Sequence, residues 1–225
     1  MSISNAVRIT TGFIAVAGAF LAPNVASAQV APAPPAAALC IACHGVHGEG
    51  APTGAPRLAG QDAAYLSHAL SLFKAGTRVG PIMQPIAQRL SDAQMSELAN
   101  YFSQQSATLA EGQSAASPRL LQAGKQLAEA GVASVAACFS CHGVQGKGNG
   151  ARFPSIAGQP AQFVINRLHA FQGRARAKAP QPGTMTAVAA TLDESQIQAA
   201  AAYLSRLESQ RLPALAEEGA RSSGN

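Results

Sequence analysis

Apolar residues in this chain recur at intervals of three and four positions, the spacing of an amphipathic helix, and show no sustained alternation typical of strands. One such stretch spans roughly residues 62–75. A second begins at Ser91, which is followed three residues later by Gln94, the pattern of a helix-capping box. Its apolar face consists of Met95, Leu98, Ala99 and Phe102. The pattern predicts two helices in this part of the chain and an all-α fold.

This pair of helices belongs to a unit that occurs twice. At an offset of 98 positions, the segment Pro56–Gln61 matches Pro154–Gln159. After four extra residues in the second copy the offset becomes 102, and Met83 then matches Met185. A duplication followed by one loop insertion leaves this kind of register. We therefore expect two tandem domains of the same fold.

The second copy repeats the helix signals of the first but differs upstream of them. Its first helix opens at Pro160, a residue suited to a first helical turn, and its second opens at Asp193 with another capping box. Residues 117–130 predict a further helix before these two. The corresponding part of the first copy contains three prolines, so its leading helix must be short or begin after Pro35.

The first 28 residues have the features of a secretory signal peptide. Arg8 supplies the positive charge, residues 11–22 are apolar or small, and Ala26-Ser27-Ala28 is an A-x-A cleavage site. The apolar run is too short for a comfortable transmembrane helix. We expect cleavage after Ala28 and a periplasmic protein, with retention of the segment as a membrane anchor as the alternative.

These signals divide the chain into five parts. We expect a signal peptide (1–28), an N-terminal domain (29–104), a linker (105–116), a C-terminal domain (117–208) and a polar tail (209–225).

The formal charge of +5 does not by itself indicate a nucleic-acid-binding protein. Acidic and basic residues cancel between positions 29 and 107, and the excess lies in the C-terminal half, which includes Arg174, Arg176 and Lys178. No basic stripe interleaved with aromatic residues is present, so we expect no nucleic-acid partner. The three basic residues form either a solvated loop or a surface that attracts an acidic partner.

All four cysteines fall in two copies of one motif, Cys40-Ile41-Ala42-Cys43-His44 and Cys138-Phe139-Ser140-Cys141-His142. Cys-x-x-Cys-His is the signature of covalent c-type haem attachment. A zinc ribbon needs its two cysteine pairs about 15–20 residues apart, and a thioredoxin motif needs a neighbouring βαβ pattern. Two disulfides would not require a histidine after each pair. The motif predicts two haem c groups, bound through thioethers from Cys40, Cys43, Cys138 and Cys141.

The histidine of each motif, His44 or His142, is then the proximal iron ligand. Candidates for the opposite face are Met83 and Met185, which lie in loops containing Pro and Gly and are equivalent under the repeat. Met95 falls on an apolar helix face and is predicted to be a core residue. The other histidines, His47, His68 and His169, have no histidine at the equivalent position of the other copy. We expect them to make local hydrogen bonds only.

These motifs together resemble the cytochrome c4 family of diheme proteins. The resemblance runs from about Leu39 to Leu207 and includes both haem motifs, both loop methionines and the two Pro-x-Leu/Ile-Ala-Gly-Gln segments. It implies two class I cytochrome c domains whose haems face each other across the domain interface. It also implies that the carbonyls of Pro56 and Pro154 accept hydrogen bonds from the proximal imidazoles. The proline-rich leader before Cys40 departs from the family pattern.

Methionine and histidine on opposite faces leave no open iron site, which favours electron transfer over catalysis. The leading hypothesis is a periplasmic carrier between a respiratory donor and a terminal oxidase or reductase. An alternative is the diheme subunit of a dehydrogenase complex, such as a sulfide-oxidising flavocytochrome. A third is an enzyme, either a diheme peroxidase, which needs an open iron, or a thiosulfate dehydrogenase, whose thiolate ligand would need a fifth cysteine. We expect redox-protein partners, compatible with transient contact with membrane complexes, and a monomer.

Overall fold

The computed structural model describes residues 32–106 and 116–207, and within these ranges the chain is helical. The N-terminal domain contains η1 (Pro35–Ala37), α1 (Ala38–His44), α2 (Ala63–Lys74), α3 (Met83–Gln88) and α4 (Asp92–Gln104). The C-terminal domain contains α5 (Pro118–Glu129), α6 (Phe139–His142), η2 (Val144–Gly146), α7 (Ala161–Ala177), α8 (Met185–Ala190) and α9 (Glu194–Leu204). Extended pairing in the described ranges is limited to two isolated bridges. The predicted all-α fold with two tandem domains is confirmed.

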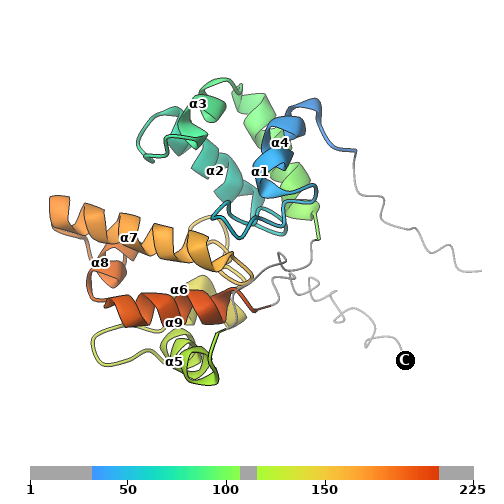
Figure 1. The fold of residues 1–225 in the computed structure, drawn as a ribbon. Coiled ribbons are helices and arrows are strands. Elements are labelled where there is room, and N and C mark those ends of the chain that lie inside the picture. The colour runs from blue at the N-terminus through green and yellow to red at the C-terminus, as the bar shows by residue number, and fades with distance from the viewer. Residues whose placement is uncertain (1–31, 107–115, 208–225) are drawn as a thin grey trace, which may run out of the picture.

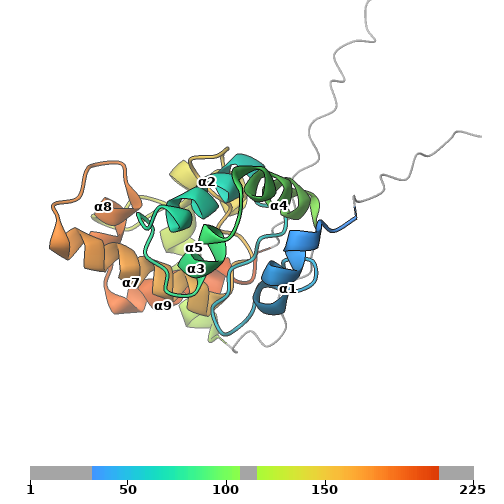
Figure 2. The ribbon, with the colours of Figure 1, turned by 90° about the horizontal axis from the view of Figure 1, so that it is seen from above.

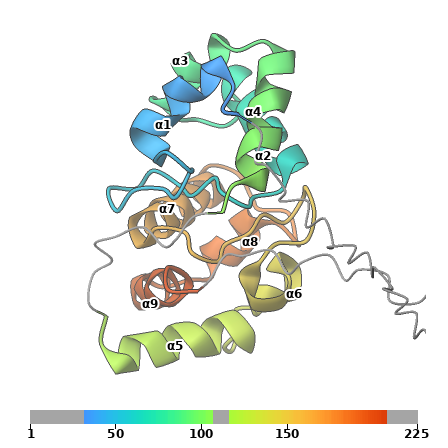
Figure 3. The ribbon, with the colours of Figure 1, turned by 90° about the vertical axis from the view of Figure 1, so that its right-hand side faces the viewer.

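The two domains are stacked, and α7 lies between the loops of the N-terminal domain and α9 (Figures 1 and 3). Seen from above, α1 and α4 of the first domain lie on the right, and α7 and α8 of the second domain extend to the left (Figure 2). The predicted signal peptide, most of the linker and the polar tail lie outside the described residues. None of the helices in the described ranges is long and apolar enough to span a membrane.

Both capping boxes form as predicted. The Ser91 hydroxyl accepts from the Gln94 amide, and the Gln94 side chain accepts from the Ser91 amide at 2.9 Å. Asp193 and Gln196 make the same reciprocal pair at the start of α9. These bonds satisfy amides that have no partner within the helix. They fix the start of the helix that carries each domain's buried apolar face.

Three local expectations need correction. Met83 and Met185 do not lie in the middle of loops, because each is the first residue of a short helix, α3 or α8. Pro160 is the residue that caps α7 and does not occupy its first turn. The α7 helix runs for 17 residues against 12 in α2, so the extra residues of the second copy lengthen this helix and not the loop after it.

The leading segments of the two domains pack differently, as the prolines in the first copy suggest. In the N-terminal domain the short η1 turn takes the place of a helix, and Ala37 is fully buried in the core with residues of α4. In the C-terminal domain the full helix α5 crosses α9. A Cβ atom on Gly124 would collide with the Ala199 carbonyl oxygen and lie 2.6 Å from Tyr203 Cβ. Only glycine therefore permits this close helix crossing.

We expect Gly124→Ala to lower the free energy of unfolding of the holoprotein by about 1–3 kcal/mol, the usual cost of overpacking. The matched control is Gly173→Ala, because that helical glycine in α7 is exposed and has nothing within 4 Å of its would-be Cβ. There, the better helix propensity of alanine should stabilise the protein by up to about 1 kcal/mol. Chemical denaturation followed by circular dichroism measures both, and equal effects of the two changes would contradict the packing argument.

Candidate haem sites

Each Cys-x-x-Cys-His motif ends with a short helix, and Cys138 is the residue that precedes the helix in the second copy. The α1 helix ends at His44 and α6 ends at His142. The glycine that follows each histidine has a positive φ, 85° at Gly45 and 75° at Gly143, a conformation that other residues rarely adopt. This turn ends each helix directly after its histidine. It therefore fixes where the cysteine and histidine side chains of one motif lie relative to each other.

The four cysteine thiols are free in the structure. Cys40 and Cys138 are partly buried, whereas Cys43 and Cys141 are exposed. Burial raises the pKa of Cys40 and of Cys138 to about 11. These two thiols therefore remain protonated near neutral pH.

The two motif histidines are buried and make the same hydrogen bond in both domains. His44 Nδ1 lies 2.8 Å from the Pro56 carbonyl oxygen, and His142 Nδ1 lies 2.7 Å from that of Pro154. Because a carbonyl oxygen can only accept, Nδ1 carries the proton in both rings and Nε2 keeps its lone pair. Burial lowers the pKa of both histidines, and the hydrogen bond offsets part of that shift. Both side chains are thus neutral imidazoles with Nε2 available to a metal.

In the C-terminal domain a methionine sulfur faces this nitrogen. His142 Nε2 and Met185 Sδ are 3.5 Å apart. The start of α8 places Met185, and the Thr184 hydroxyl caps that helix by accepting from the Ala187 amide. Met83 holds the same position at the start of α3 in the N-terminal domain. The structure thus brings an imidazole nitrogen and a thioether sulfur of the C-terminal domain together in one place.

A group of arginines fits an anionic porphyrin. Arg78 Nε is buried and has no hydrogen-bond partner. Burial, together with the charges of Arg78 and Arg174, lowers the pKa of Arg167 to about 10. Arg167 and Arg174 both pack against the Phe171 ring, with guanidinium carbons 4.7 and 4.5 Å from its centroid. Haem carries two carboxylates, which would neutralise such a cluster. The soft sulfur and imidazole donors match its iron, so the residues present fit the group.

The other histidines take no part in these sites. His47 and His68 are exposed. His169 Nε2 pairs with Glu194 at 2.8 Å. Met95 is 3% exposed and belongs to the core of its domain, as predicted.

A contact between the domains involves the peptide groups that bond His44 and His142, and it was not predicted. Gln159 forms two hydrogen bonds with the backbone of Arg57, and Gln61 forms two with the backbone of Ser155. Arg57 and Ser155 are equivalent under the repeat, as are the two glutamines. The signal in the sequence was a glutamine closing an otherwise apolar Ala-Gly-Gln segment in both copies. Sequence alone does not show that each glutamine bonds the opposite domain.

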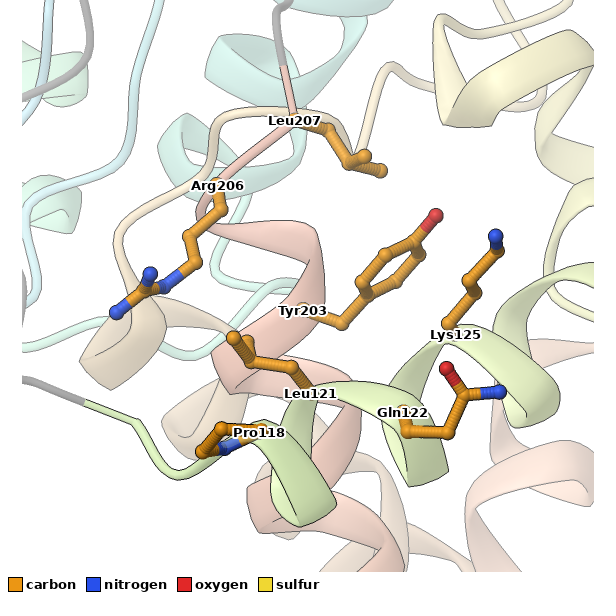
Figure 4. Close-up of a pocket in the computed structure, with 7 residues that line it drawn as sticks. All are labelled: Pro118, Leu121, Gln122, Lys125, Tyr203, Arg206 and Leu207. Carbon is orange, nitrogen blue, oxygen red and sulfur yellow. The ribbon is translucent and has the colours of Figure 1, made fainter.

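A surface groove lies elsewhere, between α5 and the end of α9 (Figure 4). Its cavity of about 380 Å³ is lined by Pro118, Leu121, Gln122, Lys125, Tyr203, Arg206 and Leu207. None of these belongs to either haem motif. The groove is therefore separate from the two sites described above.

Both domains are similar to known cytochromes c. The cytochrome c family model matches residues 36–106 and 121–208. The thiosulfate dehydrogenase electron acceptor of Stutzerimonas stutzeri is 38% identical over 178 residues, which cover 77% of this chain and 81% of that protein. Cytochrome c4 of Azotobacter vinelandii is 35% identical and covers 76% of this chain and 85% of its own length. The crystal structure of reduced cytochrome c4 from Pseudomonas stutzeri superposes with a TM-score of 0.67 at 34% identity, covering 76% of this chain and 94% of that one.

We expect the purified holoprotein to contain two covalently bound haems and each double cysteine variant to contain one. Cys40→Ala with Cys43→Ala should remove the first haem, and Cys138→Ala with Cys141→Ala the second, because each motif attaches its own porphyrin. Pyridine haemochrome absorbance and intact mass measure the stoichiometry. The two variants are matched controls for each other. One haem in the wild-type protein, or two in either variant, would contradict the assignment.

Proposed function

The chain belongs to the diheme cytochrome c4 family of electron-transfer proteins, and on that premise we propose that it carries electrons in the periplasm between a respiratory donor and a terminal oxidase or reductase. It holds two covalently bound haem c groups, one in each domain. The observation that carries the proposal is that His142 Nε2 and Met185 Sδ lie within 3.5 Å of each other. With a haem inserted between them, these two side chains would supply one iron ligand on each face.

We infer the same ligand set in both domains. Cys40, Cys43, Cys138 and Cys141 form the thioethers, His44 and His142 are the proximal ligands, and Met83 and Met185 are the distal ligands. The repeat supports the assignment in the N-terminal domain, where Met83 begins α3 as Met185 begins α8. Pro56 and Pro154 orient the proximal rings through their carbonyl oxygens.

The haem supplies a one-electron ferric/ferrous couple when bound, and the protein determines how that couple is used. The methionine thioether is a soft, neutral ligand that favours ferrous iron and raises the reduction potential relative to a second histidine. The buried imidazoles, with their protons fixed on Nδ1, would present Nε2 to the iron in one direction. A methionine on the opposite face would exclude water and substrates from the iron. This combination suits rapid electron exchange and not catalysis at the metal.

The surface next to each haem motif supports contact with a redox partner. Val46 and Val144 lie two residues after the proximal histidines, are equivalent under the repeat, and are 58% and 74% exposed. We propose that a redox partner approaches each domain at this position, because it lies beside the residues that attach the haem.

For the donor we propose thiosulfate dehydrogenase. The support is the relative from Stutzerimonas stutzeri, which is named as the electron acceptor of that enzyme and aligns over most of both chains. In this role the present chain accepts electrons and needs no thiolate-ligated haem of its own.

We also propose that residues 1–28 direct export and are removed, and that residues 29–104 and 117–208 form the two haem domains. The support is the apolar run with an A-x-A site before Gln29 and the attachment of haem c outside the bacterial cytoplasm.

The methionine assignment predicts the spectra of two variants. Ferric Met83→Ala and Met185→Ala should each lose half of the near-infrared absorption band of Met-ligated haem and lower one of the two reduction potentials. Met95→Leu is the matched control, because that methionine is a buried core residue and the exchange nearly conserves volume. It should keep the full band. A full band in either alanine variant would show that the ligand at that site is different.

The donor proposal predicts reduction kinetics. Mixed with a purified thiosulfate dehydrogenase and thiosulfate in a stopped-flow instrument, both haems should be reduced, and the membrane oxidase fraction should then reoxidise them. Thiosulfate without the enzyme is the control and should reduce neither haem. If a sulfide-oxidising flavoprotein reduces the haems and thiosulfate dehydrogenase does not, the donor is wrong and the subunit alternative holds. If ascorbate-reduced protein is not reoxidised by the oxidase fraction, the carrier proposal fails.

A further inference from the structure

One peptide group links the proximal histidine of the first domain to a side chain of the second. The peptide bond between Pro56 and Arg57 accepts a hydrogen bond at its oxygen from His44 Nδ1, at 2.8 Å. The N–H of the same peptide group, on Arg57, donates to Gln159 Oε1 at 3.0 Å. His44 and Gln159 therefore act on opposite ends of a single conjugated amide.

The second domain contains the mirror image of this arrangement. The peptide bond between Pro154 and Ser155 accepts from His142 Nδ1 at 2.7 Å, and its N–H donates to Gln61 Oε1 at 3.1 Å. Because Gln61 belongs to the first domain, the two contacts cross over. Equivalent residues contact each other reciprocally, as in a symmetric dimer interface.

Both glutamines are held firmly and shielded from water. Gln159 also donates to the Arg57 carbonyl at 3.0 Å, and Gln61 donates to that of Ser155 at 2.7 Å. The two glutamines are 3% and 4% exposed. In such an environment hydrogen bonds are electrostatically stronger than in water and polarise their neighbours.

Two glycines allow the backbone to pass close to the amide nitrogens of Arg57 and Ser155. A Cβ on Gly50 would lie 2.8 Å from the Arg57 nitrogen and 3.0 Å from Pro160 Cγ of the other domain. Likewise, a Cβ on Gly148 would lie 2.9 Å from the Ser155 nitrogen. Both glycines leave room for the amide that the opposite glutamine contacts.

These hydrogen bonds change the reduction potential of each haem in one direction. An amide whose N–H donates to an acceptor carries more negative charge on its oxygen, so it accepts more strongly from the imidazole. A more strongly bonded imidazole is a better electron donor to iron, which stabilises the ferric state and lowers the reduction potential. Each glutamine therefore lowers the potential of a haem in the domain to which it does not belong.

We propose that Gln159 tunes the haem held by His44 and that Gln61 tunes the haem held by His142, so that docking of the two domains sets part of both potentials. This inference rests on the proposed proximal ligation by these histidines. The glutamines are positioning residues, because they act through a peptide group and do not touch the iron.

The test compares Gln159→Met with Gln61→Met in the holoprotein. Methionine keeps the length of the side chain and removes the amide. Gln159→Met should raise the potential of the first haem and Gln61→Met that of the second. We expect a change of about three- to tenfold in the ferric/ferrous equilibrium constant, the upper limit corresponding to about 59 mV for one electron.

Redox titration followed by NMR separates the two haems, since haem resonances can be assigned to a domain through their contacts with the Cys40 or Cys138 thioether. A larger shift of the haem in the other domain supports the proposal for each variant. Equal shifts of both haems, or a larger shift of the haem in the variant's own domain, would overturn it. The shifted ring protons of His44 and His142 in the ferric wild-type protein test ligation itself, so failure of the proposed function is recognised separately.

A second measurement, hydrogen exchange in the wild-type protein, tests the proposal without a variant. It applies even if either substitution prevents folding. Ferric iron makes His44 Nδ1–H a stronger donor, which should strengthen the whole chain of hydrogen bonds to Gln159. Exchange of the Arg57 amide hydrogen should therefore be slower in ferric than in ferrous wild-type protein, and the Ser155 amide should behave likewise. Equal or faster exchange in the ferric protein would overturn the proposal.

Discussion

The hydrogen bond from a buried proximal imidazole to a proline carbonyl is the constraint on which the rest of this structure depends. It puts the proton of His44 and of His142 on Nδ1 and leaves Nε2 free to bind iron. For the bond to form, a loop twelve residues downstream must return to the histidine. The glycine after each histidine turns the chain sharply enough for that return. Helix, turn and loop thus work together to present one nitrogen atom in a fixed direction.

Because this unit is duplicated, equivalent residues of the two domains contact each other reciprocally at the domain interface. The loop that accepts the proximal hydrogen bond also carries the glutamine that bonds the other domain, so the haem environment and the interface are made from the same few residues. Buried polar groups of this kind are costly unless every bond is made. The crossed pairs meet that requirement at both ends. Domain docking and haem chemistry are therefore physically connected, although the haem motifs lie 98 positions apart in the sequence.

Periodicity and the repeat predicted the main helices well, because capping boxes at Ser91 and Asp193 and apolar faces such as that of Met95 are local signals. The two haem motifs could also be predicted, because the spacing of their cysteines and histidine is what covalent haem attachment requires. The short helices that begin at Met83 and Met185 were missed because six residues contain too little periodic pattern to predict a helix. The crossed glutamine contacts could not be predicted either. Whether Gln61 and Gln159 bond their own domain or the other one depends on how the two domains stack. No local sequence pattern predicts that stacking.

With the proposed ligands, both irons are closed on both faces, and the protein would move electrons and transform no substrate. Exposure of the fully reduced holoprotein to carbon monoxide at neutral pH tests this most directly, because carbon monoxide binds ferrous haem wherever an axial position is open. The visible spectrum should remain unchanged at both haems. Stoichiometric formation of a carbon monoxide adduct at one haem per chain would reveal an open iron and contradict the proposed ligands.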